Sequence, residues 1–352
     1  MAASGAFAQS SVELFGIVDI GLQYGHGSAS NKTQLAGSGQ ESASRLGFRG
    51  TEDLGGGLKA GFWLEGSLAA DNGTGASAVT KDNQTELANT GLSFNRRSTV
   101  SLMGNFGEVR LGRDYTPTFW NDTQFDPFGT VGVGASLINK VAAGTNGLNG
   151  AGGATNVRAS NSIGYLLPGN IGGFYGQLMY AMGENNTNTG VTEKNGNYAG
   201  GRLGWANGPV NVALAYGEQK LALVGNIKTT NLAGSYDFGM AKLMAEYSQI
   251  KDGQSDKGQG YLLGATAPVG ASGLFKVSYS DYKVTSPLLT SSARAKQLAL
   301  GYVHSLSKRT AMYGTFARIN NNGNAAMAIG GATLTNFGDS SYGYDIGIRH
   351  AF

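Results

Sequence analysis

The sequence lacks cysteine altogether and contains only 6 prolines and 3 histidines in 352 residues. Without cysteine, the chain has no disulfide bond, no thiolate metal site and no cysteine nucleophile. No hydrophobic run approaches the roughly 18 consecutive apolar residues of a membrane-spanning helix, which excludes a helical membrane protein. The histidines, His26, His304 and His350, lie far apart without the spacing of typical metal ligands, so we expect neither a metal nor a cofactor.

A strong charge of either sign is also missing. Lysine and arginine together number 26, against 23 aspartates and glutamates, which gives a formal net charge of +3. A chain that binds nucleic acid would carry its basic residues in a cluster or stripe. We therefore expect no nucleic-acid partner.

Glycine and aromatic residues are abundant: the chain has 58 glycines, 16 tyrosines and 15 phenylalanines. Glycine disfavours helices and aromatic residues favour strands, so the composition predicts an all-β protein. At this length, a single large barrel and a two-domain sandwich are both open.

The first ten residues, MAASGAFAQS, are similar to the end of a secretory leader. Ala6, Phe7 and Ala8 fit the A-x-A pattern of a cleavage site, although the basic segment and most of the apolar segment are absent. We expect residues 1–8 to be the remnant of a signal peptide and residues 9–352 to form the barrel domain. An ordinary disordered N-terminus is the alternative.

An alternation of period two recurs along the whole chain. In LKAGFWLEGSL at 58–68, apolar side chains occupy the even positions apart from Gly66, and mostly polar residues and glycine lie between them. Successive side chains of a strand point to opposite faces, so each such segment has one apolar and one wet face. The same pattern appears at 12–22, 212–216, 298–306 and 344–352.

The connections alternate between two lengths. Glycine, proline, asparagine and aspartate mark short turns, at 52–57, 104–107, 168–173, 207–209, 237–240, 268–273 and 306–309. Longer polar stretches lie near 25–44, 70–95, 114–157, 183–197, 218–229, 250–260, 283–295 and 320–340. Seven turns and eight loops join sixteen strands.

An even number of antiparallel strands, with short turns at one end and long loops at the other, indicates an outer-membrane β-barrel. A soluble sandwich would also alternate, but its loops would not sort so regularly by length. A closed barrel leaves no unpaired edge in lipid, and about sixteen strands leave a water channel inside. The chain ends in an alternating strand with a terminal Phe352, which is typical of such barrels, and we expect this residue to act as the membrane-insertion signal.

Five segments resemble the general porins of Gram-negative bacteria, particularly the β-proteobacterial branch. They are SSVELFGIVDIG at 10–21, SRLGFRGTEDLGGGLKAGFWLEG at 44–66, RRSTVSLMGNFGEVRLGRD at 96–114, GYVHSLSKRTAMYG at 301–314 and GIRHAF at 347–352. The resemblance implies a homotrimer of sixteen-stranded barrels in the outer membrane, in contact with its lipids and lipopolysaccharide. It further implies that each pore is narrowed by a third loop that folds inward and that it passes ions and small hydrophilic solutes.

Arginines at the loop-bearing ends of strands are the candidate site residues. Strand parity turns several of them toward the interior, namely Arg45, Arg49, Arg97 and Arg158, whereas the resemblance favours Arg96 over its neighbour, and both alternatives stay open. In related porins, wall arginines face acidic groups on the third loop. Here that loop, 114–157, offers Asp114, Asp122 and Asp126, and Glu65 lies on the wet face of its own strand.

A transverse field of this kind selects ions, and the excess of arginine predicts a preference for anions. A channel specialised for phosphate or small organic anions is the main alternative. A barrel enzyme is a weaker alternative, since no nucleophile motif such as G-x-S-x-G accompanies the histidines. An adhesive role of the loops is a further one. The first strand has one anomaly, because Phe15 and Ile17 lie on its wet face, which suggests that they pack against the inward loop.

Overall fold

The computed structural model describes residues 11–75, 78–80, 83, 86–88, 91–138, 157–188, 190–222, 225–253, 255–287 and 289–352. The expected leader at 1–8 and the middle of the third loop lie outside these residues. The strands at the start of the chain are β1 (Ser11–His26), β2 (Lys32–Ala36), β3 (Arg45–Gly55), β4 (Leu58–Ser67), β5 (Ala78–Thr80), β6 (Glu86–Ala88), β7 (Arg97–Gly104) and β8 (Gly107–Tyr115).

Helix α1 (Pro117–Phe125) follows β8 directly, and a short 3-10 helix, η1 (Gly190–Thr192), lies in the next long loop. No helix in the described part of the chain is both long and apolar enough to cross a membrane. The remaining strands are β9 (Arg158–Leu166), β10 (Phe174–Ala181), β11 (Tyr198–Asn207), β12 (Val210–Gln219), β13 (Ile227–Asp237), β14 (Lys242–Lys251), β15 (Lys257–Val269), β16 (Gly273–Thr285), β17 (Ala293–Ser305), β18 (Thr310–Gly323) and β19 (Ser341–Ala351).

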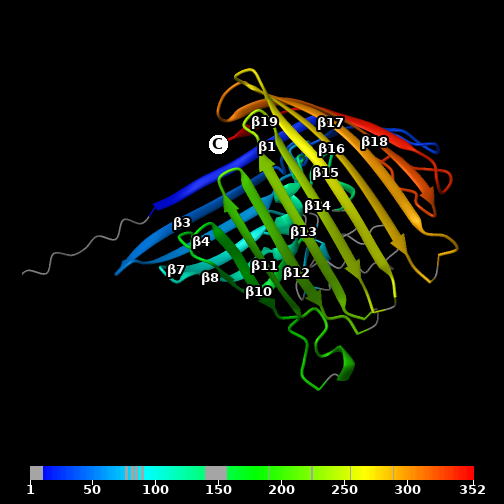
Figure 1. The fold of residues 1–352 in the computed structure, drawn as a ribbon. Helices are drawn as coiled ribbons and strands as arrows, with labels where there is room; N and C mark the ends of the chain where they lie inside the picture. The colour runs from blue at the N-terminus through cyan, green and yellow to red at the C-terminus, as the bar shows by residue number, and fades with distance from the viewer. Residues whose placement is uncertain are drawn as a thin grey trace, which may run out of the picture.

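Sixteen long strands form one closed antiparallel barrel, which confirms the prediction (Figure 1). Each pairs with its neighbours in chain order, and β1 pairs with β19 to close the ring, with Ile17 opposite Ala351. Backbone hydrogen bonds of 3.1 Å in both directions join Gly16 to Phe352 beyond the last paired residues. Strand β3 pairs with residues 11–17 of β1, and β2 pairs with residues 21–25 of the same strand, closer to the long-loop end.

The connections sort by length as predicted. All seven expected turns join consecutive strands of the barrel, and Gly55, Gly56 and Gly57 at the first of them have φ of 80°, 61° and 83°, which favours glycine. The eight long loops all lie at the other end. Strands β2, β5 and β6 lie within the first two of these loops, where the sequence predicted no regular structure.

The two faces of the barrel wall differ in polarity. The outer face exposes large apolar side chains, for example Leu203, Leu214 and Leu232 on three successive strands. The residues between them point inward and are polar or small, as with Arg202, Ala213 and Asn231. The wall therefore presents hydrocarbon to the outside and groups that water or a loop can contact to the inside.

The third loop lies against the inner face of β11 to β14. Thr116 caps α1 by accepting a hydrogen bond from the Phe119 amide, and a proline occupies the first position of the helix. From α1, Asn121 receives a hydrogen bond from Arg202 (2.5 Å) and donates one to Asn231 (2.9 Å), both on the inner face. The helix consequently occupies part of the interior of the barrel.

Beyond α1, the loop forms a hydrophobic core inside the barrel. Phe128, Val133 and Leu137 pack with inward-facing side chains near the long-loop ends of β13 to β18, such as Ile250 and Tyr282. The alternation in the sequence did not predict an apolar patch on the inner face. It arises because the loop, and not water, covers this part of the wall.

Candidate functional site

Glu65 on β4 is the centre of a cluster of charged side chains at the level where the third loop begins. Its carboxylate accepts hydrogen bonds from Arg96 Nε (2.5 Å), Arg45 Nη1 (3.4 Å) and the indole nitrogen of Trp63 (3.1 Å). Glu65 is only 5% exposed. Two arginines from the ends of the first and second long loops thus meet at one carboxylate.

Arg158 joins the same cluster through Tyr115. The Tyr115 hydroxyl accepts hydrogen bonds from Arg96 Nη2 (2.7 Å) and from Arg158 Nη2 (2.8 Å). The Arg158 guanidinium also lies over the Tyr115 ring, 4.4 Å from its centroid. The structure therefore brings Arg45, Arg96 and Arg158 together around Glu65, and we call these four residues the upper cluster.

Arg97 also faces the interior. The sequence left open whether Arg96 or Arg97 does so, and in the structure both do. Arg97 stands opposite Glu65 in the strand register, and its guanidinium lies over the Trp63 ring at 4.5 Å. Arg96 precedes the first regular residue of β7, where strict alternation does not hold, and its side chain reaches the same side. Parity had indicated Arg97 and the family pattern Arg96, and the structure places both side chains on the inner side of the wall.

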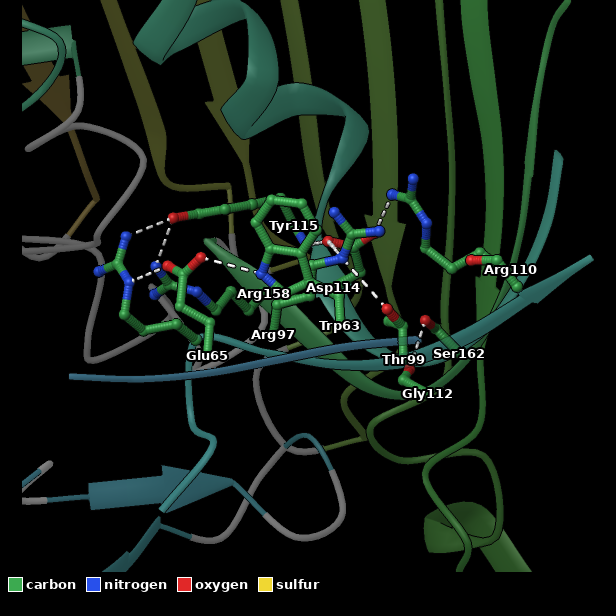
Figure 2. A network of polar contacts seen from close by, with 12 residues as sticks. Trp63, Glu65, Arg97, Thr99, Arg110, Gly112, Asp114, Tyr115, Arg158 and Ser162 are labelled. Atoms are coloured by element: carbon green, nitrogen blue, oxygen red, sulfur yellow. Dashed lines mark hydrogen bonds and ion pairs between the residues drawn. The ribbon is translucent and has the colours of Figure 1, made fainter. Parts of the chain in front are cut away.

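Asp114 does not belong to the third loop, contrary to the expectation from sequence. It is a residue of β8, where its carboxylate forms an ion pair with Arg110 on its own strand and lies 3.8 Å from Arg97 on β7. The Arg110 guanidinium also binds Glu108 (2.9 and 3.0 Å). Asp114 therefore neutralises arginines of its own wall (Figure 2).

Asp122 and Asp126 are on the loop, but neither points toward the upper cluster. Asp122, 2% exposed, accepts a hydrogen bond from Asn231 (2.9 Å) and contacts the Glu246 carboxyl on β14. Asp126, 5% exposed, accepts hydrogen bonds from three backbone amides of its own loop. Burial raises the pKa of each aspartate to about 6. Asp122 therefore attaches the loop to the wall at β13, whereas Asp126 holds the loop in its own folded conformation.

Phe15, one of the two apolar residues on the wet face of the first strand, packs against the wall and not against the loop as expected. Phe15 packs edge-on against Trp63, with ring centroids 5.0 Å apart, and lies under the Arg49 guanidinium at 5.0 Å. Arg49 itself binds Glu13 through two hydrogen bonds of 2.7 and 2.9 Å. Trp63, Arg49 and Glu13 line a recess of about 300 Å³ toward the short-turn end, and its lining includes none of the third-loop residues that the structure describes.

Sequence reasoning did not select Arg113 and Tyr115. Arg113 donates hydrogen bonds to the Asn95 carbonyl (2.5 Å) and to Ser160 Oγ (2.8 Å), two residues from Arg158. The feature of the sequence that could have indicated Arg113 and Tyr115 is their position, because both lie at the end of the strand that leads into the third loop. A polar or aromatic residue at such a strand end can reach both the wall and the loop.

A closed barrel of this size, apolar outside and lined with charged groups at its waist, defines a passive channel of the outer-membrane porin class. The chain belongs to the Gram-negative porin family, whose model matches residues 1–324. It is therefore a channel protein of the outer membrane.

Individual relatives agree with this assignment. The chain is 42% identical to outer membrane porin protein 32 of Delftia acidovorans, over 100% of this chain and 97% of the relative. It is 27% identical to an outer membrane porin protein of Bordetella pertussis, over 90% and 91% of the two chains. The structure is similar to that of the anion-selective porin from Comamonas acidovorans, with a TM-score of 0.82, 39% identity and coverage of 98% and 100%.

Proposed function

We propose that the channel prefers anions and that the upper cluster is the origin of this preference. Arg45 and Arg96 pair with the single carboxylate of Glu65, whereas the third guanidinium, that of Arg158, binds the Tyr115 hydroxyl, so positive charge predominates on this stretch of wall. A second group of charged residues lies closer to the short turns and has no excess charge, because three arginines pair with three carboxylates. We call it the lower group, and it consists of Arg49, Arg97 and Arg110 with Glu13, Glu108 and Asp114. We infer the anion preference from this difference in charge between the two groups.

The narrowing of the lumen makes these charges effective. At an effective dielectric constant of about 20, a unit charge about 4 Å from an anion contributes about 4 kcal/mol, against about 1 kcal/mol in bulk water. Across a wide pore, salt would screen most of this attraction beyond a Debye length of about 8 Å. Because α1 fills part of the interior, anions pass close to the opposite wall, where the upper cluster lies.

Conductance in salts of unequal ion size tests the proposal. In planar bilayers, we expect the purified protein to conduct well when chloride is paired with a bulky cation such as Tris. The conductance falls strongly when potassium is paired with a bulky organic anion such as MOPS. Equal conductance in the two salts, or the opposite order, would refute the anion preference.

The second candidate is a channel specialised for phosphate or small organic anions. The rings of Trp63 and Tyr115 beside Arg97 and Arg158 favour it, since aromatic and basic side chains alternate along the wall. Such a channel would bind its solute, so millimolar phosphate or acetate would reduce the chloride current in a saturable way. A general channel would show only the small, non-saturating change expected from mixed salts.

We further propose a homotrimer, embedded in outer-membrane lipid and lipopolysaccharide, that carries out no chemical step. The apolar outer face and the membership of the porin family support this assembly. Light scattering in detergent would give three copies per particle, and a monomeric mass would refute the trimer.

Mass spectrometry of protein from outer membranes would test the processing site, with an N-terminus at Gln9 as the expected result. An unprocessed first segment would contradict it.

A further inference from the structure

Tyr115 connects the third loop to the upper cluster. It is the last residue of β8, and Thr116, which caps α1, follows it directly. Its ring stacks on Phe119 of α1, with centroids 5.4 Å apart and an interplanar angle of 11°, and meets the edge of Trp120 at 5.3 Å. The ring is therefore fixed by the first turn of the helix.

The Tyr115 hydroxyl holds two cations at one oxygen atom. A phenol oxygen has two lone pairs, and here it accepts one hydrogen bond from Arg96 and one from Arg158. The two guanidinium groups repel each other, so without a shared acceptor their side chains would separate into the lumen. The face of the ring adds a cation–π contact to Arg158.

Arg96 and Arg158 differ in their other partners. Arg96 also binds Glu65, which cancels part of its charge. For Arg158, the described residues include no carboxylate within ion-pair distance, and Tyr115 is the side chain that binds it. A phenol fixes a cation without neutralising it, which a carboxylate in the same place would not do.

We propose that Tyr115 is a positioning residue for ion selectivity, which holds the Arg158 guanidinium beside that of Arg96 with its charge uncancelled. The inference rests on the proposed anion preference. Tyr115 contacts no permeating ion in this account, and it acts through the two arginines. Figure 2 shows Tyr115 and Arg158 on the Glu65 side of the polar network, away from Arg110.

The conservative variant Tyr115→Phe tests this role, because it keeps the ring and removes the shared acceptor. From the reversal potential under a KCl gradient, we expect the ratio of chloride to potassium permeability to fall about threefold, as the hydrogen bonds to charged groups are lost. Tyr165→Phe is the matched control. The Tyr165 hydroxyl donates to a backbone carbonyl near the short-turn end of β9, so its loss leaves the ratio unchanged.

A double-variant cycle separates positioning from a merely structural role. If Tyr115 acts through the arginines, Tyr115→Phe has no further effect on selectivity in an Arg96→Ala, Arg158→Ala background. If the hydroxyl only stabilised the loop, the same threefold loss would persist in that background. The heat resistance of Tyr115→Phe in detergent would match that of the unmodified protein, which excludes general misfolding as the cause.

The results of these measurements separate the role of Tyr115 from the anion preference of the channel. An unmodified channel without anion preference would overturn both. An anion-preferring channel whose selectivity is unchanged in Tyr115→Phe would overturn the role of Tyr115 alone. A lower selectivity that persists equally in the arginine-free background would also overturn it.

Discussion

A guanidinium group in a channel wall attracts anions only to the extent that no neighbouring carboxylate cancels its charge. The wall of this barrel contains both situations. Arg110 binds two carboxylates, and Arg49 binds one through a bidentate pair. Arg158 binds a phenol instead. The number of lumen arginines is therefore a poor guide to selectivity, and their partners decide it.

Removal of single arginines tests this view. We expect Arg158→Ala to lower the ratio of chloride to potassium permeability severalfold, because the variant removes a charge that the wall does not cancel. Arg45→Ala lowers it less, since Arg45 shares Glu65 with Arg96. Arg309→Ala, at an exposed short turn, is the control and leaves the ratio unchanged. Equal effects of all three variants on the reversal potential would contradict the argument.

Glu65 contributes more to stability than an exposed glutamate with a similar partner. Glu65→Gln leaves buried guanidinium groups without their carboxylate, and breaking a buried pair costs about 3–5 kcal/mol. Glu13→Gln is the matched control, since its pair with Arg49 is exposed and a pair of that kind contributes little. Thermal unfolding followed by circular dichroism in detergent measures both. A Glu65 variant no less stable than the Glu13 variant would refute this ranking.

Strand parity and loop-end position are local properties of the sequence, and the structure turns the arginines that they indicated to the interior. Asp122 and Asp126 were chosen from the resemblance to porins, and the structure buries both away from the upper cluster. Whether a loop carboxylate faces an arginine or a distant strand depends on how the loop packs, and that is set by contacts such as the one between Asn121 and Asn231, 110 positions apart. Tyr115 was missed because its partners, Arg96 and Arg158, lie 19 and 43 positions away and meet its hydroxyl only in the folded barrel.

At the scale of elements, the third loop is attached to the wall by polar contacts at and beyond α1. Gln297 on β17 donates to the Ala135 carbonyl (2.9 Å), and Asp345 on β19 accepts from the Val133 amide (2.7 Å). Before these, Asp122 meets Glu246 through a contact between two carboxyl groups. Such a contact is favourable only while one of the two groups carries a proton.

Asp122 contributes to the pH dependence of stability, because burial beside the Glu246 carboxyl raises the pKa of Asp122. The folded state therefore keeps a proton on this group at a pH where the unfolded chain, with a carboxyl pKa near 4, has lost it. The stability that this group contributes is complete below about pH 4 and is lost as the pH rises through the folded-state pKa.

Asp122→Asn removes the contribution of this group and leaves that of Asp126, whose pKa is also raised. Between pH 4.5 and 7.5, the thermal unfolding midpoint of the unmodified protein falls relative to that of Asp122→Asn. Asp237→Asn, at an exposed turn where either residue can accept from the Gly239 amide, is the control and keeps the unmodified profile. Parallel profiles of the unmodified protein and Asp122→Asn would show that the carboxyl contact does not hold the loop.

The closure of the barrel depends on a glycine beside the last residue. A Cβ atom at Gly16 would lie 2.3 Å from the Phe352 ring and 2.8 Å from the Arg45 carbonyl oxygen. Gly16→Ala therefore displaces Phe352, and we expect a lower yield of heat-resistant barrel on refolding. At Gly314 on β18, the nearest atoms to such a Cβ lie 3.9 Å away, so Gly314→Ala is tolerated. Equal refolding yields of the two variants would contradict the account.

The strands were predictable because each carries its own alternation and its own turn residues. The elements within the long loops were not, since β2 forms by pairing with β1, and α1 lies against five strands, β10 to β14. The inward apolar patch around Ile250 and Tyr282 follows the same rule. The sequence of β14 or β16 alone does not predict this apolar patch, because the patch is buried by the third loop.

For the whole molecule, the interior divides into two parts. The described part of the third loop and its hydrophobic core lie against the side bounded by β11 to β18, and the charged clusters line the side bounded by β3 to β9. Solutes therefore pass along one wall, which is basic at the level of Glu65 and balanced toward the short turns. This arrangement gives a sieve whose charge is concentrated at one level.

The reversal potential of the unmodified protein under a KCl gradient shows whether the wall arginines make the channel anion-selective. We expect a potential with the sign of chloride preference, which shrinks as the salt concentration on both sides is raised, because screening weakens the field of the arginines. A potential with the sign of potassium preference, or one near zero at low salt, would refute the anion preference.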